Sequence, residues 1–91
     1  MLYFIEHKDS GTEQKYSCQF QTHDVFEAVE TATKVAKVFH EKYSEHYKNN
    51  FEENWSEARK NQFFRLNAWA VRVKDDDGKT VLLLNSERLR G

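Results

Sequence analysis

The chain has 91 residues, of which 38% are hydrophobic and 14% aromatic, and its formal net charge is -1. This length fits one small domain spanning residues 1–91, and it leaves no room for a separate catalytic domain or a deep cofactor cavity. The near-neutral charge excludes a polybasic nucleic-acid-binding arm and an acidic mimic of DNA.

Cysteine usage and hydropathy indicate the compartment. Cys18 is the single cysteine, so an intramolecular disulfide is excluded and we expect a reducing, cytoplasmic location. The apolar residues 1–5 are followed at once by Glu6 and Lys8, which makes them too short for a signal-peptide core or a membrane span. We therefore expect no contact with a membrane.

Two strands are predicted in the first quarter of the chain. Residues 2–8 are rich in apolar and aromatic side chains, and residues 14–22 alternate with a period of two. The alternation places three residues on one face, which we expect to be buried: Tyr16, Cys18 and Phe20. Gly11, between the two strands, can adopt the positive φ of a short hairpin loop.

An amphipathic helix is predicted from Asp24 onward. Apolar residues recur at steps of three and four, as one buried stripe requires: Val25, Val29, Ala32, Ala36, Phe39 and Tyr43. Asp24 is a suitable N-cap, and Glu27 places negative charge at the positive end of the helix dipole.

The apolar stripe continues as Tyr47, Phe51 and Trp55, but successive steps of four rotate these residues away from the first stripe. One straight helix cannot bury both sets. Asn49 and Asn50 lie where the rotation begins, which favours a break there and a second helix of about eleven residues capped by Asn50. The alternative is one continuous helix of about 35 residues, which would overhang so small a domain.

From Phe63 the chain is predicted to be extended again. Alternate residues then share one face of a strand: Trp69, Val71 and Val73. Gly78 follows three aspartates and marks a hairpin turn, and the apolar run at 81–84 is typical of an inner strand or of one covered on both faces.

Together these elements predict an α+β fold of the order ββα(α)ββ. It is a two-layer sandwich, in which a four-stranded antiparallel sheet carries one long bent helix or two helices on one face. The order of the strands stays open.

No catalytic or metal-binding motif is recognisable. Four histidines match none of the spacings that hold a metal: His7, His23, His40 and His46. The acidic turn lacks an EF-hand pattern, because Val73 and Leu84 occupy positions that need oxygen ligands. We therefore expect no catalytic residues, no metal and no cofactor, and a small hydrolase or nuclease ranks third among the functions.

The aromatic residues exceed what one layer of core can cover, so some are predicted to contact a partner. Tyr47, Phe51 and Trp55 would form a ridge at the positions i, i+4 and i+8 that anchors another protein. The alternative is that a second helix folds back and buries Phe51 and Trp55. An acidic turn would steer the chain toward a basic partner: Asp75, Asp76 and Asp77.

These features favour a small non-enzymatic regulator or inhibitor that occupies a partner protein's surface, of the kind that phages and other mobile elements encode. The alternative function is nucleic-acid binding through a polar, weakly basic sheet face that carries Lys15, Arg72 and Lys74. A homodimer is compatible with each of these functions, because a two-layer domain leaves one sheet face and two edge strands to cover.

Overall fold

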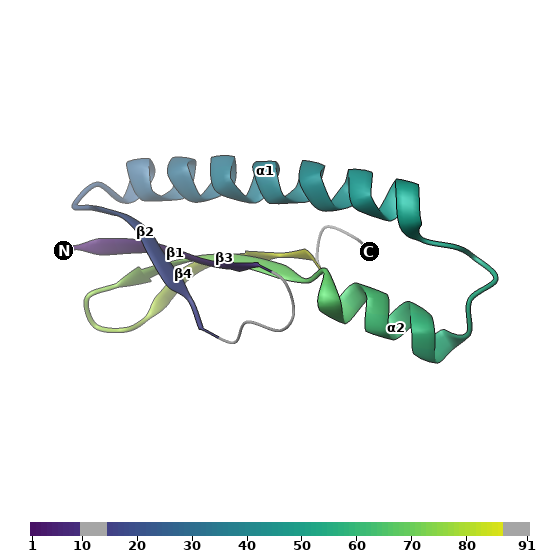
Figure 1. Cartoon of the computed structure of the whole chain (residues 1–91). Helices are drawn as coiled ribbons and strands as arrows, with labels where there is room; N and C mark the ends of the chain where they lie inside the picture. The colour runs from purple at the N-terminus through teal and green to yellow at the C-terminus, as the bar shows by residue number, and fades with distance from the viewer. Residues whose placement is uncertain (10–14, 87–91) are drawn as a thin grey trace.

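The structure is a computed structural model that describes residues 1–9 and 15–86. The described residues form, in chain order, β1 (Tyr3–Asp9), β2 (Ser17–Thr22), α1 (Val25–Asn50), α2 (Glu57–Leu66), β3 (Trp69–Asp75) and β4 (Thr80–Asn85). The strands make one antiparallel sheet of order β2-β1-β3-β4, and α1 lies along one face of it (Figure 1). The predicted α+β fold class is confirmed. The predicted loop around Gly11 lies outside the described residues.

The hydrophobic core lies between α1 and the two central strands. The buried stripe of α1 consists of Ala28, Ala32 and Ala36. Opposite this stripe, β1 and β3 contribute the fully buried Ile5, Val71 and Val73. Because alanine side chains are short, the helix axis can lie close to the sheet while the branched side chains fill the space between them.

Side chains at both ends of α1 form hydrogen bonds with backbone groups of the helix. The Asp24 carboxylate accepts hydrogen bonds from the amides of Phe26 (2.9 Å) and Glu27 (3.4 Å), as the predicted N-cap requires. At the other end the side-chain amide of Asn50 donates to the carbonyl of His46 at 3.0 Å, and the backbone amide of Phe51 donates to the carbonyl of Tyr47 at 2.9 Å. The helix ends at Asn50, so the predicted break is confirmed.

The second helix begins later than predicted. Its N-cap is Ser56, whose hydroxyl accepts from the amide of Arg59 at 3.2 Å, and not Asn50. Residues 63–66 were expected to be extended but form the end of α2, and the strand begins only at Trp69. The physical reason is the aromatic packing described below, which holds the rings of this segment against the end of α1.

A β-bulge changes the faces of β2. Ile5 of β1 pairs with Phe20, but Glu6 pairs with Cys18, so Gln19 is an extra residue in the ladder. One inserted residue reverses the side of every residue before it, which keeps Phe20 on the helix side and turns Cys18 to the opposite side. Cys18 is exposed and Phe20 is 39% exposed. The prediction that the apolar residues of β2 share one buried face was therefore wrong.

β4 lies at an edge of the sheet and pairs with β3. Its apolar run at 81–84 had predicted an inner strand or one covered on both faces. Val81 is instead 43% exposed, and residues 82–85 are only partly buried. The periodicity of a single strand does not indicate its neighbours, so this prediction was wrong.

α1 is longer than the sheet beneath it. Its 26 residues span about 39 Å at 1.5 Å per residue. A seven-residue strand such as β3 spans about 23 Å. The C-terminal part of α1 therefore extends past the sheet, and α2 lies beneath that overhang (Figure 1). Within the described residues, neither helix has both the length and the apolar character that crossing a bilayer requires.

The alanine stripe gives the first testable prediction. We expect Ala32→Leu to lower the free energy of unfolding by about 1 to 3 kcal/mol, because the larger side chain forces α1 away from the sheet. Ala58→Leu, at an exposed position of α2, is the matched control and should stay within about 0.5 kcal/mol of the parent. Chemical denaturation measures both variants, and equal effects would contradict close packing at Ala32.

Candidate partner-binding groove

An aromatic cluster joins the end of α1 to α2. We use this name for His46, Tyr47, Phe51, Trp55, Phe63 and Phe64. The ring centroid of Phe51 lies 4.5 Å from that of Tyr47 and 5.5 Å from that of Trp55. It also lies 5.7 Å and 5.4 Å from the centroids of Phe63 and Phe64. Such ring pairs contribute roughly 0.5 to 1.5 kcal/mol each beyond their buried area, so this cluster fastens α2 to α1.

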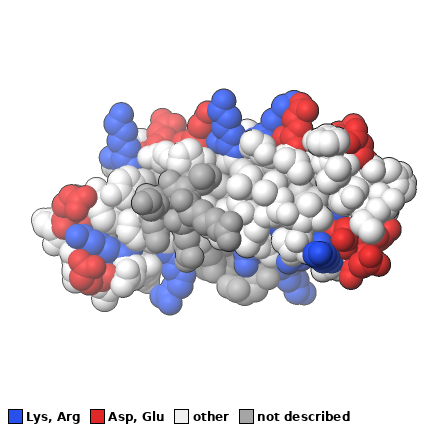
Figure 2. Space-filling view, turned by 180° about the vertical axis from the view of Figure 1, so that it is seen from behind, with Lys and Arg blue, Asp and Glu red and all other residues white. Residues whose placement is uncertain are grey.

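Charged side chains cover the outer side of the aromatic cluster. The guanidinium of Arg59 lies 4.3 Å from the ring centroid of Trp55, and the ammonium of Lys60 lies 5.9 Å from that of Phe51. Lys60 also lies 3.8 Å from the carboxylates of both Glu53 and Glu57. Figure 2 shows that charged side chains of both signs also lie along α1 and at both ends of the molecule.

The predicted ridge of Tyr47, Phe51 and Trp55 takes a different form in the structure. The three rings touch in sequence, but α1 ends at Asn50, so they do not lie along one helix. Phe51 and Trp55 are half-buried inside the aromatic cluster, whereas Tyr47 is 38% exposed. Of the three residues, Tyr47 is the one most available to a partner.

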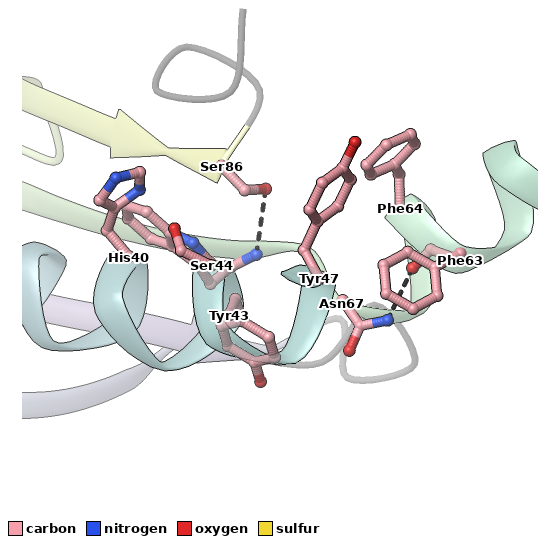
Figure 3. Close-up of a pocket in the computed structure, with 9 residues that line it drawn as sticks. His40, Tyr43, Ser44, Tyr47, Phe63, Phe64, Asn67 and Ser86 are labelled. Atoms are coloured by element: carbon pink, nitrogen blue, oxygen red, sulfur yellow. Dashed lines mark hydrogen bonds between the residues drawn. The ribbon is translucent and has the colours of Figure 1, made fainter. Parts of the chain in front are cut away.

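A groove lies between α1, α2 and the adjoining ends of β3 and β4. Its volume is about 320 Å³, and it is lined by His40, Tyr43, Ser44, Tyr47, Phe63, Phe64, Asn67, Trp69 and Ser86. In Figure 3 the rings of Tyr47 and Phe64 stand side by side, one from each helix. Their centroids are 5.8 Å apart and their planes are 19° from parallel. The walls of this groove are thus mainly aromatic.

Two hydrogen bonds fix the chain segments that line the groove (Figure 3). The Ser86 hydroxyl accepts from the backbone amide of Trp69 at 3.3 Å, which links the end of β4 to the start of β3. The Asn67 side-chain amide donates to the carbonyl of Phe63 at 2.8 Å, which closes the end of α2. On the α1 side, His40 and Ser44 place an imidazole and a hydroxyl at the opening. This arrangement offers apolar contact with a few orienting polar groups.

The acidic turn is built around Asp75. This residue is 8% exposed, and its carboxylate accepts from the backbone amides of Asp77 (3.0 Å) and Lys79 (2.9 Å). The Asp76 carboxylate accepts from the backbone amide of Leu2 at 3.2 Å. The buried Asp75 is therefore part of the turn and is not displayed on the surface as predicted, while Asp76 and Asp77 are exposed.

Gly78 adopts a φ of 83° in this turn, as its position after three aspartates predicts. Among the described residues, Asp75, Asp76 and Asp77 place one carboxylate oxygen each within 4.8 Å of one another, close enough for one cation. The hydrogen bonds of the turn already account for this arrangement. The turn also lies at the opposite end of the molecule from α2, so the predicted acidic and aromatic residues do not meet (Figure 1).

The predicted basic face is neutralised in part, at Arg72. Arg72 lies with its Nε 2.7 Å from a Glu6 carboxylate oxygen and with its guanidinium 3.6 Å from the ring centroid of Tyr16. Lys74, two residues along β3, shares this outer face, whereas the exposed Lys15 precedes β2. Of the three predicted cations, Arg72 is therefore paired within the chain, and its guanidinium covers one face of the Tyr16 ring.

Sequence reasoning missed the polar residues of the groove: His40, Ser44, Asn67 and Ser86. They come from α1, from the end of α2 and from the end of β4, and no local spacing connects them. The excess of aromatic residues near 47–64 was the one signal that pointed to this end of the chain.

Comparison of the chain with protein-family models, with curated proteins and with solved structures finds no match. The groove is therefore the feature of this chain that bears on its function. That geometry combines an open apolar cavity with a polar opening.

The separation of the aromatic cluster from the core gives a second prediction. We expect Phe51→Ala to increase hydrogen exchange of the α2 amides at residues 63–66 at least about tenfold, because α2 loses its central contact with α1. Exchange of the β3 amides should not change. Leu66→Ala, at a 44% exposed position of α2, is the control. Equal losses in α2 and β3 would show that the aromatic cluster and the core unfold as one unit.

The acidic turn gives a third prediction. We expect Asp75→Ala to lower the free energy of unfolding by about 1 to 3 kcal/mol, because two backbone amides lose a charged acceptor. Asp77→Ala, which changes an exposed carboxylate of the same turn, should cost less than about 0.5 kcal/mol. Thermal and chemical denaturation compare the pair. Equal stability of the two variants would contradict a structural role for Asp75.

Proposed function

We propose that this chain is a small protein-binding module that takes an apolar segment of a partner protein into the groove. The observation that carries the proposal is the open cavity of about 320 Å³ with aromatic walls, of which Tyr47 remains 38% exposed. Burial of apolar surface is the main favourable term in association, and aromatic residues dominate the energetics of protein interfaces.

The chemistry of the groove supports a binding role. Cavities of roughly 300 to 1,000 Å³ accept ligands, and this one lies at the small end of that range. Its size suits one or two large apolar side chains of a partner. The exposed His40 and Ser44 offer hydrogen bonds at the opening, where they would orient the partner's backbone. The module would act as a regulator or inhibitor by occupying the surface from which those side chains come.

The acidic turn is not part of this proposed binding surface. The groove is lined by Trp69 at the start of β3, whereas the acidic turn follows Asp75 at the other end of this strand, about 20 Å away. Charges in water are screened over about 8 Å at physiological ionic strength. Asp76 and Asp77 would therefore have little influence on a partner that approaches the groove.

Nucleic-acid binding is the less favoured function. Phosphate attraction depends on cations that are free to release counterions, and Arg72 is paired with Glu6 at 2.7 Å. The Tyr16 ring, which would otherwise stack on a base, is covered by the same guanidinium at 3.6 Å. Protein binding at the groove is therefore the favoured function.

The proposal predicts that filling the groove abolishes partner capture. Ser44→Phe adds a ring at the α1 side of the cavity and leaves the core untouched. Lys34→Phe is the matched control, because it places the same ring on an exposed position of α1 outside the groove. We expect immobilised parent and Lys34→Phe proteins to capture the same partner from a lysate of the native host, and Ser44→Phe to lose it.

Nuclease treatment of the lysate separates the two functions. A protein partner should persist after treatment, whereas loss of every partner would favour nucleic-acid binding instead. Capture that is equal for Ser44→Phe and Lys34→Phe would contradict the groove as the binding site. Circular dichroism of each variant shows whether the fold is retained.

A further inference from the structure

β4 forms an apolar, uncharged edge of the sheet. Its sequence, Thr-Val-Leu-Leu-Leu-Asn at residues 80–85, contains no charged residue and no proline. The strand order places β3 on one side of β4, and within the described residues no strand pairs with its other side. On that side the backbone groups of residues 81–84 meet no other strand of the described chain, and buried backbone groups need hydrogen-bond partners. An edge strand of this composition is a template for pairing with another strand.

The other edge of the sheet is protected in a way that β4 is not. β2 also lacks charged residues and proline, but it carries a bulge at Gln19 in the middle of the strand, which discourages pairing. The register of β4 is also irregular, but the irregularity lies at Val81, next to the turn. Residues 82–85 continue beyond it in regular register with β3.

The composition of β4 is that of an inner strand, although the chain places it at an edge. A second strand paired with its other side would make β4 an inner strand, which is the environment that the apolar run Leu82, Leu83 and Leu84 predicts. Antiparallel pairing about a two-fold axis sets a strand opposite itself, so a second copy of this chain supplies an uncharged strand of matching length.

We propose that the chain forms a two-fold symmetric dimer through antiparallel pairing of β4 with β4 of a second copy. The axis is normal to the sheet, which keeps both α1 helices on one face and makes a continuous eight-stranded sheet. Leu83 lies opposite its own counterpart, and Leu82 lies opposite the second copy's Leu84. Uncharged side chains meet across the axis, so no like charges oppose one another.

The expected dimer is reversible. Pairing of two short edge strands buries less surface than a standard stable interface, which is about 1,600 Å². Sedimentation velocity and light scattering from low micromolar to near-millimolar protein should therefore show a mass that rises from one chain to two. A mass of one chain over this whole range would overturn the proposal, as would growth beyond two.

Leu83→Glu is the decisive variant. In the parent register Leu83 lies opposite Arg72 of β3, whose guanidinium already pairs with Glu6, so the new carboxylate shares that cation within its own chain. Across the dimer axis, however, it meets a second carboxylate. We expect this variant to stay monomeric at every concentration while it keeps its circular dichroism spectrum. Gln21→Glu, on the same outer face of β2 at the other edge, is the matched control and should dimerise like the parent.

Hydrogen exchange gives an independent readout that uses the parent protein alone. The β4 amides should exchange more slowly as the protein concentration rises, and the β2 amides should not. Slowing at β2 and not at β4, or a dimer that survives Leu83→Glu, would overturn the proposal. Neither measurement uses the groove, so the dimer and the proposed binding function can fail separately.

Discussion

The close contact between the alanine stripe of α1 and the central strands is the constraint on which the rest of the structure depends. Ala28, Ala32 and Ala36 lie against Ile5, Val71 and Val73, and these residues are all buried. This contact anchors α1 through its N-terminal half. Since the sheet is shorter than the helix, the last turns of α1 beyond Tyr43 extend past the core, and α2 packs against them through the aromatic cluster.

The groove follows from this overhang. The aromatic cluster fastens α2 to the end of α1, and the chain must then turn back to begin β3 at the margin of the sheet. Trp69 belongs both to the core and to the groove, and its ring lies 6.0 Å from that of Phe39. One wall of the groove is therefore fixed by the core, whereas the other depends on the aromatic cluster. The wall formed by the aromatic cluster can adapt to a partner through small movements of α2, while the core between α1 and the sheet stays intact.

The two proposed surfaces have complementary roles. The groove would bind a partner through apolar burial at one end of the molecule, and the β4 edge would join two copies through backbone hydrogen bonds. A dimer would carry two grooves, so a partner with two matching segments would bind more tightly than to one copy. The exposed charges of α1 have no part in either contact. The i, i+4 pair of Lys34 and Glu30 is highly exposed, and such pairs contribute little to stability.

Local chemistry by itself determined the fold class, the N-cap of α1 at Asp24, the end of the helix at Asn50 and the turn at Gly78. Caps, turn residues and helical periodicity act within a few residues, so one segment contains the whole signal. Tertiary structure alone decided the strand order, the bulge that turns Cys18 outward and the helical state of residues 63–66. It also decided that four polar residues of separate elements meet in one groove. Each of these features depends on contacts between residues that are distant in the chain, and the pattern of a single segment carries no information about its neighbours.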